Sequence, residues 1–284
     1  MEHQLELETY ITKGKLYKHN ARSIVATEKL MMKNSSETMV EKEYISKKPF
    51  GQGDIFRVIT HSETYGAESA TEKLAKDLNS LISNIGVYTN ELGYLEAIIN
   101  KEEVFDKWHV LKKRWKKESS KEESAQVAAT IHTVEENLQN GSFVREMTEQ
   151  GALYFLFSGA YRSYSNKEPI EVKRDLNKFL VLQPLPLNIT YIVEKYDRLT
   201  RKLVLKGKGQ LAKDRLDQLL LNKMVRGIKD KINLKVELNV FYVEHLYFDQ
   251  YGWLEKADQN VKVKIPGFYM TESEQKLVEI DRYE

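Results

Sequence analysis

The stretch Tyr251-Gly252-Trp253-Leu254-Glu255-Lys256 repeats a pattern that appears earlier as Leu92-Gly93-Tyr94-Leu95-Glu96-Ala97. Each copy follows the quadruplet Leu-Ala-Lys-Asp, at residues 211–214 and 74–77. Both quadruplets open a helical pattern, and both glycine-containing stretches are typical of a tight turn between two strands. Chance alone produces roughly one four-residue coincidence in a chain this long, so the evidence is the pairing of quadruplet and turn in the same order. This order predicts two copies of one α+β unit, an internal duplication.

The composition predicts a folded chain of about two domains. Its 284 residues are 30% charged and 41% hydrophobic, which is a globular composition. Lys and Arg total 44 against 42 for Asp and Glu, so no strong net charge favours binding to nucleic acid or to an acidic membrane. The chain contains no cysteine, which excludes disulfides and thiolate chemistry.

The sequence also bears on the compartment. No segment reaches the ~18 consecutive apolar residues that a membrane helix needs. The first residues show no basic head and no apolar run of a signal peptide. We therefore expect a soluble cytoplasmic protein, or a periplasmic or exported one if a leader peptide has been removed.

Residues 1–100 are predicted to form the N-terminal α+β unit. Runs at residues 5–11, 23–32, 38–46 and 55–61 predict an antiparallel meander, with a hairpin loop at Lys33-Asn34-Ser35-Ser36. Ser69 and Glu72 form a capping-box pattern. One apolar helical face then contains Leu74, Leu78, Leu81, Ile82 and Ile85. Strands at residues 87–90 and 94–99 are expected to flank the first glycine turn.

Residues 101–182 are predicted to form a helical insert. The apolar stripe of its first helix is Val104, Trp108, Leu111 and Trp115, and that of its second is Ala125, Ala128, Ile131, Val134 and Leu138. Ser142 would cap a third helix that contains Phe143, Met147, Leu153 and Phe157. A further short helix is expected at residues 171–182.

Residues 183–284 are predicted to form the C-terminal α+β unit, entered through the linker Gln183-Pro184-Leu185-Pro186. A hairpin is expected with strands at residues 189–194 and 199–205. A helix follows with Leu216, Leu219, Leu220, Met224 and Ile228 on one side. The clean alternation at residues 234–248 predicts a long strand, turned into another at residues 253–265. The last fifteen or so residues are expected to be a loose tail.

Histidine and carboxylate pairs are the first candidates for chemistry. His132, Glu135 and Glu136 have the spacing of metal ligands on one helical face, but no second cluster completes a ligand set, which favours a solvated polar face. His245 and Asp249 would share one face of a strand as an acid–base pair, but no nucleophile turn accompanies them. A satisfied histidine beside a turn aspartate is the favoured interpretation, and His109 is interpreted in the same way.

Glycine-rich and basic segments are the next candidates. Gly207-Lys208-Gly209 and Phe50-Gly51-Gln52-Gly53 lack the other residues of a phosphate-binding loop, and the first is expected to ease a strand into a helix. Lys112-Lys113-Arg114-Trp115-Lys116-Lys117 could contact phosphates, but Trp115 fits the apolar stripe of its helix. A second basic strip, suited to an acidic partner, contains Lys195, Arg198, Arg201, Lys202, Lys206 and Lys208.

The most apolar stretch, residues 151–161, is expected to be a helix buried between the two units, or else a helix that binds a partner or lines a ligand site. The predicted fold class is thus α+β, with two antiparallel-sheet units, each packed with an amphipathic helix, and a helical insert between them. We assign no catalytic residue, metal ligand or cofactor site.

Three functions remain open. The leading hypothesis is a non-enzymatic protein-interaction or assembly scaffold that binds a protein partner or a second copy of itself, and nucleic acid is not favoured as a partner. The alternative is a carrier or binding protein for a small apolar ligand or lipid, because a curved sheet around a helix can enclose such a ligand. The third is a hydrolase-type enzyme whose site is not visible in the sequence.

Overall fold

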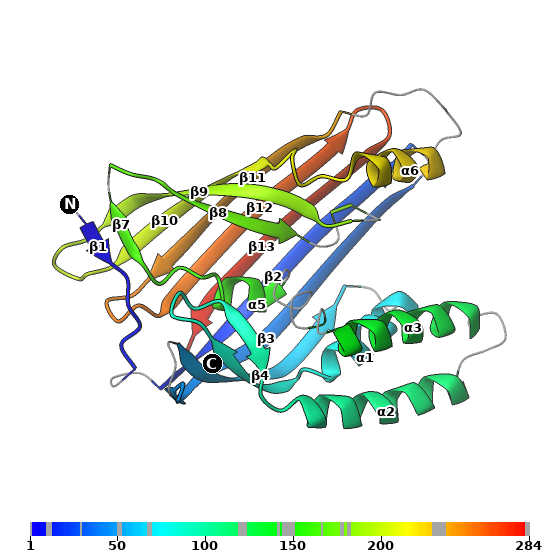
Figure 1. Cartoon of the computed structure of the whole chain (residues 1–284), viewed down its shortest axis with the longest axis horizontal. Coiled ribbons are helices and arrows are strands. Elements are labelled where there is room, and N and C mark those ends of the chain that lie inside the picture. Colours follow the sequence, from blue (N-terminus) through cyan, green and yellow to red (C-terminus); the bar gives the residue numbers. More distant parts are fainter. Residues whose placement is uncertain are drawn as a thin grey trace.

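The structure is a computed structural model of the chain (Figure 1). It describes residues 2–9, 13–28, 30–49, 53–66, 70–118, 124–140, 143, 151–165, 167–176, 179–180, 183–228 and 237–281.

Eleven of the described strands form one antiparallel sheet, in the spatial order β6-β5-β4-β3-β2-β13-β12-β11-β10-β9-β8. They are β2 (Gly14–Thr27), β3 (Met31–Lys47), β4 (Asp54–Tyr65), β5 (Asn84–Thr89), β6 (Leu95–Ile98), β8 (Ile170–Leu176), β9 (Leu185–Tyr196), β10 (Leu203–Leu211), β11 (Asn239–Phe248), β12 (Leu254–Ile265) and β13 (Tyr269–Ile280). A separate pair joins β1 (Glu2–Gln4) to β7 (Ser163–Ser165). Among the described strands, the edge strands β6 and β8 do not pair with each other, so the sheet stays open along one side.

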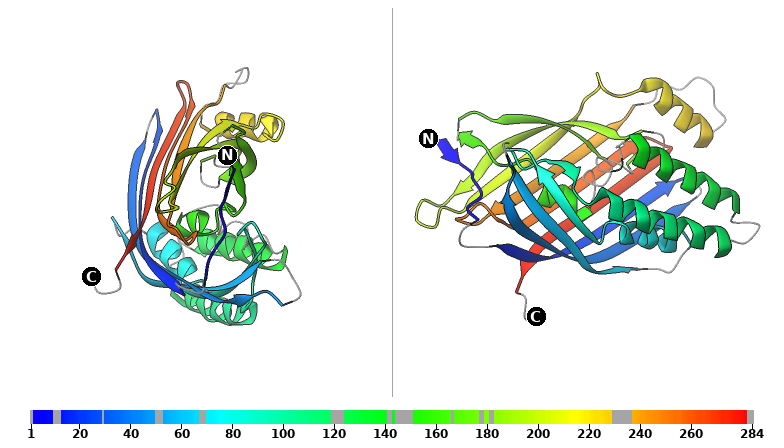
Figure 2. Two further views of the ribbon diagram at one scale, coloured as in Figure 1. Left: turned by 90° about the vertical axis from the view of Figure 1, so that its left-hand side faces the viewer. Right: turned by 60° about the horizontal axis from the view of Figure 1, so that its bottom comes forward.

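The described helices lie on one side of this curved sheet (Figure 2). They are α1 (Ala70–Ser80), α2 (Lys101–Glu118), α3 (Ser124–Asn140), α5 (Gly151–Leu156) and α6 (Gln218–Ile228). Helix α5 packs on the middle of the sheet, against β2, β3 and β13. Helices α2 and α3 pack on each other, and Trp115 of α2 donates from Nε1 to Asp77 Oδ2 of α1 at 2.7 Å.

The alternation of burial along the strands distinguishes the two faces of the sheet. On β12, Ala257, Val261 and Val263 are fully buried, whereas Asp258 and Lys262 between them are not. Because successive side chains of a strand point to opposite faces, the first set faces the helices and the second faces away. We call these the inner face and the open face. The core lies on the inner face, and charged side chains occupy the open face.

The predicted fold class is wrong, because the strands of both predicted units join one sheet. The chain is 51% strand and 24% helix, so it is mostly β and not a balanced α+β arrangement of two sheet–helix units. Strand β13 causes the difference: it pairs with β12 on one side and with β2 on the other. The last described strand thereby joins the start of the chain to its end. The predicted domain boundaries after residues 100 and 182 stay predictions.

Three local predictions are also wrong. The expected loose tail contains β13, a central strand. Lys33-Asn34-Ser35-Ser36 lies inside β3 and not in a hairpin loop, because β2 and β3 continue to Thr27 and Met31. The helix expected at residues 171–182 is instead the edge strand β8, as far as Leu176. By contrast, α2, α6 and the hairpins β5–β6 and β9–β10 are confirmed.

The repeated glycine-containing patterns at residues 92–97 and 251–256 form the same kind of turn. Asn90 Oδ1 accepts from the backbone N–H groups of Leu92 and Tyr94, at 3.0 Å each. Asp249 Oδ1 accepts from Tyr251 and Trp253 in the same way, at 2.9 Å each. The glycine in each turn has a positive φ, which is 84° for Gly93 and 76° for Gly252. The quadruplets do not match, because residues 74–77 lie in α1 whereas Leu211 ends β10.

In the described residues, no helix has the length and apolar character needed to cross a membrane.

Candidate functional site

A band of mostly polar side chains crosses the inner face of the sheet. It is a single register row, because each member pairs with the next across neighbouring strands. In spatial order the row is Tyr65, Ser36, Ala21, Gln275, Gln259, Glu244, Gly207 and Tyr191, from β4 to β9. Rows with buried apolar residues lie on both sides of it. Leu277 and Leu246 lie on one side, Val261 and Val263 lie on the other, and all four are almost completely buried. The band is therefore a polar strip within an apolar face.

Hydrogen bonds run along the band. Gln275 Nε2 donates to Gln259 Oε1 at 3.1 Å, and Gln259 Nε2 donates to the Tyr242 hydroxyl at 3.3 Å. The Tyr242 and Tyr154 hydroxyls lie 2.5 Å apart, which joins the band to α5. His19 Nε2 lies 3.2 Å from Gln275 Oε1. Burial lowers the pKa of His19 to about 4, so its imidazole is neutral at pH 7 and Nε2 carries the proton that Gln275 accepts.

Two glycines of β10 make room for the band. A Cβ on Gly207 would lie 2.9 Å from Cγ of Glu244 and 2.9 Å from Cε1 of Tyr191. A Cβ on Gly209 would lie 2.7 Å from Cδ1 of Tyr242. These side chains therefore lie over β10 where any other residue would displace them. The expectation that the two glycines ease a strand into a helix is wrong, because both lie inside β10.

At the far end of the band, the buried Glu244 and the half-buried Arg174 beside the band each have unused hydrogen-bonding capacity. Glu244 is 0% exposed and accepts from the Tyr191 hydroxyl through Oε1, while its Oε2 has no hydrogen-bond partner. Arg174 of β8 stacks over the Tyr154 ring at 3.6 Å and donates from Nη2 to the Tyr154 carbonyl at 3.3 Å. Its buried Nη1 also has no partner.

Burial also fixes the protonation of the tyrosines around these charges. Burial, and then the negative charge of Glu244, hold the pKa of Tyr191 well above its usual value. The same two causes raise the pKa of Tyr242. Both phenols therefore stay protonated, and Tyr191 acts as a donor to Glu244.

The other end of the band is incompletely filled. Ala21 and Ser23 of β2, Ser36 of β3 and Ser273 of β13 face the helices but are only half-buried. On the same strands, His19 and Leu277 toward α5 are buried, and so is Thr271 in the opposite direction. We call Ala21, Ser23, Ser36 and Ser273 the under-packed stretch. Their small side chains fill less of the space above the sheet than a large apolar side chain at the same positions would.

Lys42 of β3 is a second buried charge on the inner face. It is 3% exposed, donates from Nζ to the Leu156 carbonyl at the end of α5 at 2.8 Å, and lies over the rings of Phe56 and Phe157 at 4.3 and 4.7 Å. Burial lowers the pKa of Lys42 to about 7, and the negative charge of Asp54 opposes this shift. Its contacts are those of a lysine that fixes the end of a helix, since the last carbonyls of a helix lack partners inside it.

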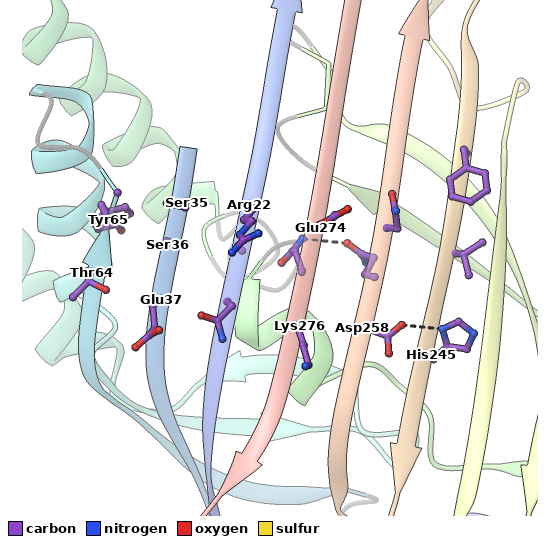
Figure 3. Close-up of a pocket in the computed structure, with 18 residues that line it drawn as sticks. Arg22, Ser35, Ser36, Glu37, Thr64, Tyr65, His245, Asp258, Glu274 and Lys276 are labelled. Atoms are coloured by element: carbon purple, nitrogen blue, oxygen red, sulfur yellow. Dashed lines mark hydrogen bonds and ion pairs between the residues drawn. The ribbon is translucent and has the colours of Figure 1, made fainter. Parts of the chain in front are cut away.

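A shallow pocket of about 870 Å³ extends from β4 to β11, lined mostly by residues of the open face and also by inner-face residues of the band such as Ser36 and Tyr65 (Figure 3). The residues labelled there are Arg22, Ser35, Ser36, Glu37, Thr64, Tyr65, His245, Asp258, Glu274 and Lys276. Opposite charges face each other across neighbouring strands, as Arg22 does with Glu274. His245 Nδ1 lies 2.9 Å from Asp258 Oδ1. Such cross-strand pairs are typical of a solvated sheet face.

A catalytic triad does not assemble in this pocket. Ser35 of β3 and His245 of β11 are four strand spacings apart, or about 19 Å at ~4.8 Å for each spacing. The predicted pair of His245 and Asp249 does not form either. Asp249 instead binds Lys15 Nζ at 2.7 Å and closes the β11–β12 turn. His245 is thus a satisfied histidine, with Asp258 as its partner.

The remaining sequence candidates lie apart from the polar band. His132 and Glu136 are exposed on α3, and Glu135 binds Lys112 of α2. The described residues contain no cluster of three or more side chains suited to a metal ion. His109 is exposed on α2. Of the phosphate-loop candidate at residues 50–53, only Gly53 lies within the described residues.

The two basic clusters are engaged with carboxylates. Arg114 pairs with Asp77 at 2.6 Å, and Trp115 is buried as expected. In the late hairpin, Lys202 pairs with Glu255 at 2.6 Å and Lys206 with Glu194 at 3.0 Å. The apolar stretch at residues 151–161 contains α5, which is buried as expected, although against one sheet and not between two units.

Sequence reasoning missed Arg174, Glu244, Gln259 and Gln275. A signal was present: Glu244 and Gln259 interrupt otherwise apolar inner positions of β11 and β12, and Gly207 and Gly209 occupy alternate positions of β10. An acidic residue at a core position beside a strand that carries glycines on the same face indicates a buried polar site.

Comparisons with known protein families and with curated proteins give no match to this chain. Among solved structures, the fold is similar to a chain from a structure of lipid–protein interactions in lipovitellin, with a TM-score of 0.47 and 12% sequence identity. The alignment covers 95% of this chain and 25% of that one, so this chain spans about a quarter of its length. A likeness this distant carries no information on function.

Proposed function

We propose that this protein is a carrier or binding protein for a small amphiphilic molecule, held on the inner face of the sheet between α5 and α6. The under-packed stretch is the observation that carries this proposal. Its four small side chains face the helices and are only half-buried, whereas His19 and Leu277 on the side toward α5 are buried. A sheet built only to fill its own core would carry larger side chains there.

An apolar rim at one end of the sheet supports the same function. Leu30, Met31 and Met32 at the tip of the β2–β3 hairpin are 56%, 62% and 47% exposed, and Leu219 of α6 is 80% exposed. Figure 1 places this tip and α6 at the same end of the sheet. Exposed apolar side chains that gather in one region mark a binding surface more often than a solvated one. No observation on the described residues favours the scaffold hypothesis over this one.

Binding of Nile red, an uncharged fluorescent dye, tests the proposal when combined with substitutions on the two faces of β13. Ser273→Trp fills the under-packed stretch, whereas Lys276→Trp adds the same side chain to the open face of the same strand. We expect the wild type and Lys276→Trp to bind the dye with similar affinity, and Ser273→Trp to bind at least about tenfold more weakly. Equal binding by both variants, or no binding by the wild type, would contradict the proposed function.

A further inference from the structure

We infer that the polar end of the band is a binding site for one uncharged polar group of the ligand, such as a hydroxyl or a primary amide, held between Arg174 and Glu244. This inference rests on the proposed function and adds the chemical class of the ligand. Its basis is the pair of unused polar atoms, Arg174 Nη1 and Glu244 Oε2.

Unused hydrogen-bonding atoms are costly when they are buried. A buried donor or acceptor without a partner costs about 1–3 kcal/mol, and more when its group is charged. Glu244 has no exposed surface at all. Two such atoms that belong to opposite charges are explained if a third group satisfies both.

Arg174 and Glu244 interact electrostatically without touching. Burial opposes the charge of Arg174, but Tyr154, Tyr191 and, after them, Glu244 together raise its pKa. Each side chain, however, is oriented by a tyrosine: Arg174 stacks on Tyr154, and Glu244 accepts from Tyr191. Both charges are thus held in place without forming a direct ion pair.

The donor and acceptor roles determine the class of group that fits. Arg174 Nη1 can only donate, and Glu244 Oε2 as a carboxylate oxygen can only accept. The occupant must therefore accept one hydrogen bond and donate another, which hydroxyl and primary amide groups do. The site is neutral overall, so a carboxylate would be repelled by Glu244 and an ammonium by Arg174 without a net charge to compensate.

The band connects this site to the under-packed stretch. Gln259 and Gln275 continue the row from Glu244 to Ala21 and Ser36. An amphiphile with its polar group at Arg174 and Glu244 would thus extend along the inner face toward the apolar rim.

A head-group series tests the inference. Palmityl alcohol, palmitamide, palmitate and palmitylamine share one chain and differ in the polar group, and each is used to displace Nile red from the protein. We expect the alcohol and the amide to bind at least about tenfold more tightly than the palmitate and the amine. This preference is measured on the wild-type protein, so the test does not depend on the folding of any variant.

Substitution of each charge should change the preference in opposite directions. Glu244→Gln leaves a net positive site and should favour palmitate, whereas Arg174→Met leaves a net negative site and should favour palmitylamine. Lys173→Met is the matched control, because Lys173 neighbours Arg174 on β8 but is exposed on the open face. It should keep the wild-type order.

The possible outcomes separate the two proposals. If none of the four compounds displaces the dye, the carrier function itself fails. If all four bind equally and the substitutions change nothing, the carrier function stands, but the two unused atoms hold only water and the inference is wrong.

Discussion

Lys42 shows how a single residue can link stability to pH in this fold. Its amine is buried against two phenylalanine rings and bonded to the end of α5. Burial lowers its pKa from 10.5 to about 7, so above pH 7 the unfolded chain holds the proton that the folded chain has lost. Since stability rises with pH wherever the unfolded state binds more protons, this residue destabilises the fold fully below pH 7 and progressively less toward pH 10.5.

We therefore expect Lys42→Met to be more stable than the wild type at pH 6, with a difference that shrinks as the pH rises to 9. The slope contributed by one proton is at most about 1.4 kcal/mol for each pH unit. Urea unfolding at a series of pH values measures it. Lys48→Met is the control, because Lys48 forms an ion pair at the surface with Glu96. Parallel pH profiles for the wild type and Lys42→Met would show that the buried amine does not titrate in this range.

At the scale of elements, the two glycine turns show what a local pattern does and does not predict. The side chains of Asn90 and Asp249 each accept two backbone hydrogen bonds, so the shared sequence pattern corresponds to a shared turn. That turn can close any antiparallel hairpin. The presence of this turn therefore does not indicate whether two hairpins belong to one sheet or to two. For this reason it did not support a duplication into two units.

The turn at Gly252 is predicted to depend on both backbone conformation and space. Its φ is +76°, and a Cβ there would lie 2.0 Å from the carbonyl oxygen of Glu6. Gly267 has almost the same φ, +74°, with nothing within 4 Å of its Cβ position. Gly267→Ala should cost only the ~1–2 kcal/mol of the left-handed conformation, and Gly252→Ala clearly more, because the N-terminal segment must also move. Equal losses in urea unfolding would mean that the contact with Glu6 contributes nothing.

Strands β13 and β8 explain why most of the remaining fold could not be predicted. Inner positions of β13 include Thr271, Ser273 and Gln275, so the apolar alternation that identifies a half-buried strand is missing. They are polar because β13 supplies part of the polar band and of the under-packed stretch. The same residues that point to a function thus conceal the strand. In β8, the alternation that begins at Ile170 and Val172 is interrupted by Arg174 at the next inner position, so the apolar pattern is too short to identify a strand.

At the scale of the whole molecule, the fold depends on long-range pairing across β13. This strand pairs with β2 from Tyr269 to Ile280 and with β12 from Tyr269 to Val278. A chain that ends at Pro266 would leave β2 and β12 with unpaired edges in the centre of the sheet. We expect it to lose cooperative thermal unfolding, measured by circular dichroism, whereas removal of residues 282–284 should leave the transition unchanged. A cooperative transition near the wild-type temperature in the shorter chain would show that β13 is dispensable.

A crystal structure of the protein grown with palmityl alcohol tests most directly whether the inner face of the sheet holds a ligand at the polar band. We predict electron density for the alkyl chain over Ser23 and Ser273, with its oxygen within hydrogen-bonding distance of Arg174 and Glu244. Density for the alcohol on the open face alone, or an inner face filled completely by the protein's own side chains, would contradict it.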